Sequence, residues 1–172
     1  MGIKRYIATK DATITNAYKS NLVDRGTRAN MGQSDILEVF SIYAQASSGS
    51  IEKSRMLLKF PVDDIIKDRA NSKIPNSGSV NFYLKLFNAR HNQSMPEDYS
   101  LTIQAVKKKW DEGYGLDMES YNDESPVNWL SASSDKTAQI VRTRFIATDK
   151  ATYTSRYISL YNGVNERYNF WF

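Results

Sequence analysis

The chain contains no cysteine and a single histidine among its 172 residues. Without cysteine, neither disulfide bonds nor thiol chemistry is available to the fold. His91 has no second histidine or cysteine with which to form a transition-metal site. We therefore interpret His91 as a residue of a surface loop.

Long apolar runs are also absent. No stretch approaches the ~20 consecutive apolar residues that cross a bilayer as a helix. The opening sequence, MGIKRYIATKD, lacks the apolar segment of a secretory signal. These absences predict a soluble protein that is made in a cytoplasm and has no membrane partner.

Neither sign of charge dominates. The chain has 23 Lys and Arg against 19 Asp and Glu, which gives a net charge of +4. The positive residues are scattered, and their only cluster is KKKW at 107–110. This cluster is too small for a nucleic-acid footprint, so we expect no nucleic-acid partner.

Motifs of catalysis are lacking as well. The Gly-Tyr-Gly stretch at 113–115 is not followed by the Lys-Ser/Thr of a phosphate-binding loop, and no Gly-x-Ser-x-Gly elbow occurs. We interpret the adjacent acids at 111–112 and 123–124 as solvated loop residues, because adjacency does not give the spacing that glycoside hydrolysis needs. The sequence predicts a protein that is not an enzyme and has no catalytic residues. A polysaccharide-degrading enzyme using acids of the 111–124 loop is the weakest alternative.

What the chain does contain is a series of short segments rich in β-branched and aromatic residues, which favour strands. A short helix is expected at 61–69, because its acidic residues come early and its basic residues late. Several short strands, one helix and long polar loops predict an all-β fold, an antiparallel β-sandwich or jelly roll. The predicted strands cover residues 6–15, 35–43, 54–60, 79–89, 99–106, 137–148 and 152–161.

Several motifs occur in a defined order between residues 5 and 132. They are an Asp-x-x-Ile strand at 11–14, an Asn-x-Gly turn at 30–32, a Leu-containing strand at 36–39, SRMLLKF at 54–60, FYLKLFNA at 82–89, Trp-x-Glu-Gly-x-Gly at 110–115 and a later tryptophan, Trp129. This order resembles the DNRLRE-domain family, jelly-roll modules related to carbohydrate-binding modules. The short form is similar to modules of marine bacteriophage virion proteins. The resemblance implies a structural or tail-associated role.

The long loop after residue 106 is rich in aromatic side chains. Flat aromatic rings beside Asp and Asn are suited to stacking on sugars, which makes four residues candidates for glycan binding. The alternative, which we favour, is that the two tryptophans pin the loop onto the sandwich, because tryptophan is largely buried on average. The candidates are Trp110, Tyr114, Tyr121 and Trp129.

Three oxygen-bearing side chains are candidate ligands of a structural Ca²⁺: Asp11, Asn30 and Asp35. Oxygen-rich turns also serve to cap backbone groups, so this alternative stays open. No other cofactor is expected.

The opening of the chain is repeated near its end. RYIATKDATITNAYKS at 5–20 recurs as RFIATDKATYTSRYIS at 144–159, with nine of 16 aligned positions identical. At the same offset of 139 residues, TRANMG at 27–32 is echoed as ERYNFW at 166–171. We interpret this as a duplicated first strand, which divides the chain into a jelly-roll module at 1–139 and a C-terminal segment at 140–172. The alternatives are coincidence of strand composition and a truncated second module.

A chain with two equivalents of one strand can pair the second with a neighbouring subunit, by β-augmentation or strand exchange. Such pairing is heterologous and produces rings or filaments. The apolar ending at 168–172 also favours burial in a neighbour. We assign assembly to Arg144, Ile146, Tyr153, Tyr157, Phe170, Trp171 and Phe172.

The resulting hypothesis is a non-enzymatic structural protein of a virion, associated with its tail or capsid. Its expected partners are identical subunits and other virion proteins. The alternative is a glycan-binding module for host surface glycans that uses the loop aromatics.

Overall fold

The computed structural model describes residues 2–75, 80–87, 89, 101–106, 108–121, 126–133, 158–160 and 169–171. Within these ranges the chain is mostly strands with one short helix, and all strand pairs are antiparallel, which confirms the predicted β-rich class. The elements are β1 (Lys10–Thr15), the 3₁₀ turn η1 (Gly26–Arg28), β2 (Ser41–Tyr43), β3 (Ile51–Lys59), α1 (Val62–Ala70), β4 (Phe82–Leu84), β5 (Gln104–Val106), β6 (Ile158–Leu160) and β7 (Asn169–Trp171).

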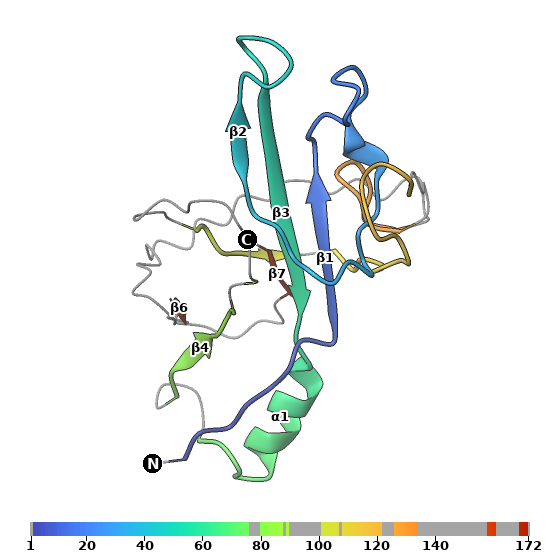
Figure 1. Cartoon of the computed structure of the whole chain (residues 1–172). Coiled ribbons are helices and arrows are strands. Elements are labelled where there is room, and N and C mark those ends of the chain that lie inside the picture. The colour runs from blue at the N-terminus through green and yellow to red at the C-terminus, as the bar shows by residue number, and fades with distance from the viewer. Residues whose placement is uncertain are drawn as a thin grey trace.

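The long strand β3 organises the sheet (Figure 1). All six residues of β1 pair with β3, from Lys10 opposite Lys59 to Thr15 opposite Ser54. Strand β2 pairs with the beginning of β3, and β7 pairs with its end. Strand β5 continues the sheet beyond β7, whereas β4 and β6 form a separate two-stranded pair.

The sheet formed by β1 and β3 is covered on both faces. Three successive residues of β3, Met56, Leu57 and Leu58, are therefore all buried, although their side chains alternate between the faces. On one face Leu57 packs in a cluster with Ala12, Ile14, Trp110, Val127 and Ala132. On the other, Met56 and Leu58 pack with Leu84 and Ile103.

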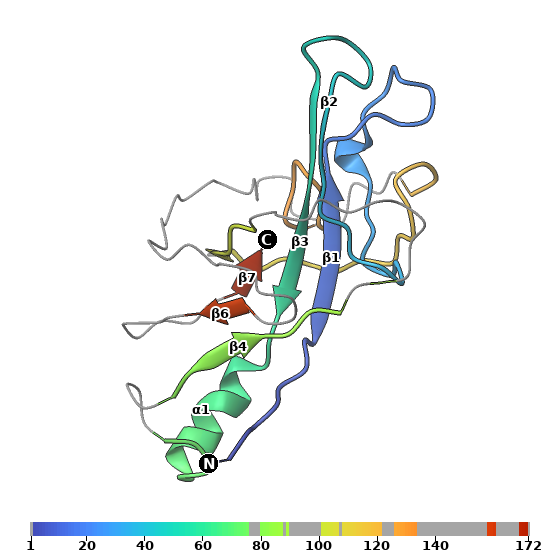
Figure 2. The same ribbon diagram turned by 60° about the vertical axis from the view of Figure 1, so that its left-hand side comes forward.

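Helix α1 confirms the predicted helix, displaced by one residue. It begins after Pro61, with two acidic residues in its first turn and Lys67 and Arg69 in its last turn, as the helix dipole favours. The N-terminal segment runs alongside this helix before it enters β1 (Figure 2). No helix within the described ranges is long and apolar enough to span a bilayer.

Four predicted strands are longer in the prediction than in the described part of the structure. The first, predicted at 6–15, begins only at Lys10 as β1. Among the described residues of 79–89 only Phe82–Leu84 (β4) form a strand, and among those of 99–106 only Gln104–Val106 (β5) do. Of the predicted strand at 35–43 only β2 forms a strand, and the contacts of Leu37 and Glu38 give the reason. Leu37 packs in the second cluster and the Glu38 N–H donates to Thr13 Oγ1 (3.0 Å), so this part of the chain lies across the sheet. The predicted strand at 137–148 lies outside the described residues.

Candidate functional site

Two loops that are far apart in sequence meet at the side chain of Asn30, which is 0% exposed. Its Nδ2 donates to the carbonyl oxygens of Glu112 (2.7 Å) and Val127 (2.9 Å). Its Oδ1 accepts from the N–H groups of Gly115 (2.8 Å) and Gly32 (3.3 Å). All four hydrogen-bonding positions of the amide are thereby used, so Asn30 fixes the 110–127 loop to the turn at 30–32.

Glycines allow the backbones of these two loops to approach so closely. A Cβ at Gly32 would meet the Glu112 carbonyl, and a Cβ at Gly115 would meet the Asn30 carbonyl. Gly113 has φ +82°, a conformation that favours glycine. The Asn-x-Gly turn and the Gly-x-Gly stretch therefore form one packed unit, called here the Asn30 junction.

The four aromatic candidates of this loop separate into two groups. Trp110 is 5% exposed within the first cluster, and its ring has no free face for a sugar. Trp129 is partly buried against the same cluster, and the Arg55 guanidinium lies 4.1 Å from the centre of its ring. Tyr114 is 86% exposed and Tyr121 is 37% exposed. The tryptophans attach the loop to the sheet, and the tyrosines are the rings that it exposes.

The three candidate calcium ligands differ in their surroundings. Asn30 has no lone pair left for a cation, because Oδ1 already accepts two N–H groups. Asp35 is exposed in the loop beyond the Asn-x-Gly turn. Asp11 lies on β1, where burial and then the Glu112 carboxylate raise its pKa. Among the residues that the structure describes, no group of three or more His, Cys, Asp or Glu side chains could hold a metal ion.

The outer edge of β1 is covered by the Glu112 side chain and by a bridge to Met31. The Asp11 N–H donates to Glu112 Oε1 (2.6 Å), and Thr13 forms an antiparallel bridge with Met31. Capping of this kind removes the free edge that would otherwise offer itself to another strand. Strand β1 thus occupies a slot that is bounded by β3 on one side and by Met31 and Glu112 on the other, called here the β1 slot.

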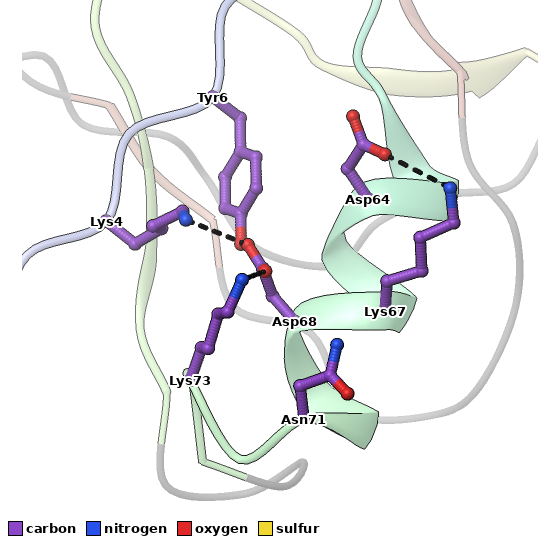
Figure 3. A pocket seen from close by; sticks show the side chains of 7 residues that line it. All are labelled: Lys4, Tyr6, Asp64, Lys67, Asp68, Asn71 and Lys73. Carbon is purple, nitrogen blue, oxygen red and sulfur yellow. Dashed lines mark hydrogen bonds and ion pairs between the residues drawn. The ribbon is translucent and has the colours of Figure 1, made fainter.

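A polar pocket lies between the N-terminal segment and α1 (Figure 3). Asp68 is its centre: Oδ2 accepts from the Tyr6 hydroxyl (2.8 Å) and pairs with Lys4 Nζ (3.0 Å). Oδ1 pairs with Lys73 Nζ (3.5 Å). Across the pocket, Lys67 pairs with Asp64 (3.7 Å). The two contacts from the N-terminal segment form a clamp that holds this segment to the helix.

The clamp changes the acidity of its members. The Tyr6 hydroxyl and then Lys4 lower the pKa of the Asp68 carboxyl. Burial, followed by the hydrogen bond to Asp68, raises the pKa of Tyr6 to about 12. Sequence reasoning missed this group, since Tyr6 and Asp68 are 62 residues apart and no local pattern joins them.

The C-terminal residues enter the main sheet as β7. Phe170 lies opposite Leu58 of β3 on one side and opposite Ala105 of β5 on the other. Trp171 lies between Leu57 and Gln104 in the same way. The remaining predicted assembly residues and the single histidine lie outside the described residues: Arg144, Ile146, Tyr153, Tyr157, Phe172 and His91.

Searches against models of protein families, curated proteins and solved structures found no match for this chain.

Proposed function

We propose that this chain is a non-enzymatic structural protein of a virion, associated with its tail or capsid, that self-assembles through β-sheet contacts and its C-terminal segment. Its partners are identical subunits and other virion proteins. The observation that carries the proposal is the place of β7, between β3 and β5 in the sheet. A terminal strand that completes a sheet from inside is the kind of element that one subunit donates to another.

The fold that we propose is the antiparallel β-sandwich, or jelly roll, of the DNRLRE-domain family. The Asn30 junction supports it. The Asn-x-Gly turn and the Trp-x-Glu-Gly-x-Gly stretch, two motifs on which the resemblance depends, pack directly on each other through Asn30. Two family motifs that lie far apart in sequence would be expected to contact each other if they belong to the same folded module.

The assembly is tested by removing residues 140–172 and measuring mass in solution by light scattering. We expect the full chain to form particles heavier than one 19.7 kDa chain and the truncated chain to remain single. If both proteins are folded and their masses correspond to the same number of chains per particle, the proposal is contradicted.

Because the deletion also removes β7, a point variant keeps the test valid if the truncated chain fails to fold. Ala151 is the counterpart of Ala12, which is 0% exposed in β1. We expect Ala151→Asp in the full chain to reduce the mass, because a buried charge opposes strand pairing. Ala46→Asp, at an exposed alanine of the β2–β3 loop, is the matched control and should leave the mass unchanged.

The second candidate function is glycan binding, and one observation favours it. Tyr114 is 86% exposed, yet it stands beside Gly115, whose N–H is bound by Asn30 (2.8 Å) and whose carbonyl accepts from the Gln33 N–H (2.9 Å). An exposed ring on a fixed backbone is a suitable platform for a sugar. Loss of glycan-array binding in Tyr114→Ala, but not in Tyr83→Ala on β4, would support this function.

A further inference from the structure

The first copy of the repeated segment places residues of like charge next to each other at two positions of the β1 slot. Lys10 lies directly opposite Lys59 in the β1–β3 register. Asp11 lies beside Glu112, which accepts its backbone N–H (2.6 Å) and contributes to raising the pKa of its carboxyl. Like charges in such positions destabilise strand pairing.

The second copy carries the opposite charges at the same two positions. Counted 139 residues on, Asp149 replaces Lys10 and Lys150 replaces Asp11. In the β1 slot, Asp149 would face Lys59 and Lys150 would lie beside Glu112. Both pairs of like charge would thereby become pairs of opposite charge.

The second copy also preserves most of the buried surface of β1. Four successive residues of β1 are at most 2% exposed: Ala12, Thr13, Ile14 and Thr15. Three of the four are identical in the second copy, as Ala151, Thr152 and Thr154. The small side chains that this slot requires are therefore present twice in the chain.

Two features favour the first copy in its own chain. The clamp on Asp68 uses Lys4 and Tyr6, whose counterparts are Thr143 and Phe145, and a phenylalanine cannot donate to a carboxylate. The fourth buried position is Ile14 in the first copy, whereas the second copy has the larger Tyr153. In the β1 slot, the first copy is thus favoured by the clamp and by its packing, and the second copy is favoured by its charges.

We propose that the β1 slot of one chain accepts residues 149–154 of a second copy of this chain, in place of its own β1. Asp149 then pairs with Lys59 of the accepting chain and Lys150 with its Glu112. This proposal rests on the proposed function and deepens it, by naming residues 149–154 as an exchanged strand and the β1 slot as its acceptor.

The exchange has a geometric consequence. Only residues 155–157 separate the donated strand from β6, which pairs with β4 of the donor, and the four Cα–Cα steps from residue 154 to residue 158 span at most about 14 Å. The accepting chain therefore lies against the β4–β6 pair of the donor. The contact is heterologous, so its repetition gives a ring or a filament.

The native chain has no cysteine, so a pair of introduced cysteines reports a single contact. The test is the full chain with Lys59→Cys and Asp149→Cys, oxidised and run on a non-reducing gel. We expect a ladder of disulfide-linked oligomers. Lys59→Cys with Lys150→Cys is the matched control, because adjacent side chains of a strand point to opposite faces and the ladder should be several-fold weaker.

The clamp provides a second arm of the experiment. Asp68→Asn, added to the Lys59→Cys and Asp149→Cys chain, weakens the hold on the first copy and should strengthen the ladder several-fold. Asp64→Asn is its control, since Asp64 pairs with Lys67 and not with the N-terminal segment. If circular dichroism shows that the Asp68→Asn chain is unfolded, the proposal is judged from the ladder of the Lys59→Cys and Asp149→Cys chain, in which Asp68 is intact.

The outcomes separate this proposal from the proposed function. If the chain with both cysteines forms particles heavier than one chain but no disulfide-linked ladder, the strand exchange is overturned and assembly still stands. Folded single chains at every concentration would overturn both. A disulfide formed within one chain, seen as a faster-migrating monomer, would also overturn exchange between chains.

Discussion

Replacing Asn30 by alanine tests how much the Asn30 junction stabilises the fold. The substitution removes four hydrogen bonds, two donated to carbonyl oxygens and two accepted from N–H groups, all at a side chain that is 0% exposed. A buried polar group that is left without a partner costs about 1–3 kcal/mol. At the low end of that range for each group, the free energy of unfolding falls by about 4 kcal/mol. Such a loss is a large part of the roughly 5–15 kcal/mol that stabilises a typical domain.

Urea unfolding followed by tryptophan fluorescence provides the assay, because Trp110 is buried in the cluster next to this junction. With a urea dependence of about 2 kcal/mol per molar, the unfolding midpoint should fall by about 2 M. Asn71→Ala is the matched control. It removes the same amide from an exposed position at the end of α1, and its effect should stay within about 0.5 kcal/mol. A loss of less than about 1 kcal/mol for Asn30→Ala, or one no larger than the control, would refute the role of the junction.

Three further predictions concern stability. Gly115→Ala should destabilise the fold by more than about 2 kcal/mol in urea unfolding, because its Cβ would meet the Asn30 backbone, whereas Gly49→Ala, with nothing within 4 Å, should be nearly neutral. Asp11→Asn should be more stable than the native chain at pH 7, since a raised folded pKa means that stability is lost as pH rises through it; the difference should vanish below about pH 4, and urea midpoints at both pH values check this. For Asp68 the sign is opposite. Its lowered pKa contributes stability above about pH 4 that is lost as pH falls through the folded pKa, so Asp68→Asn should flatten the acid limb of a stability–pH profile.

Local features of the fold were predictable from the sequence. The acidic-to-basic gradient placed α1 within one residue, and the β-branched runs indicated strands where β1 and β3 lie. Strand lengths were less predictable, because a ladder ends where its partner ends. Strand β4 spans only Phe82–Leu84, opposite the three residues of β6.

Long-range contacts were not predictable from local patterns. Asn30 suggested a turn or a metal ligand, and the neighbouring glycines were the only sign that two backbones would meet there. The run at Met56–Leu58 indicated a strand, but the sequence did not indicate which residues would cover its two faces. The clamp on Asp68 had no local signal, since Lys4 and Tyr6 belong to the irregular segment that precedes β1.

The copy of the first strand at 144–159 remains the strongest signal for function. Residues 149–154 differ from β1 only in the two reversed charges and one buried side chain, and the clamp residues Lys4 and Tyr6 are replaced as well. The differences make sense if the copies serve different chains.

The mass of the unmodified full chain in solution, measured by sedimentation over a wide range of concentration, tests the central claim most directly. Assembly through the C-terminal segment predicts particles that grow with concentration in multiples of the 19.7 kDa chain. A single folded species of 19.7 kDa at every concentration would contradict it.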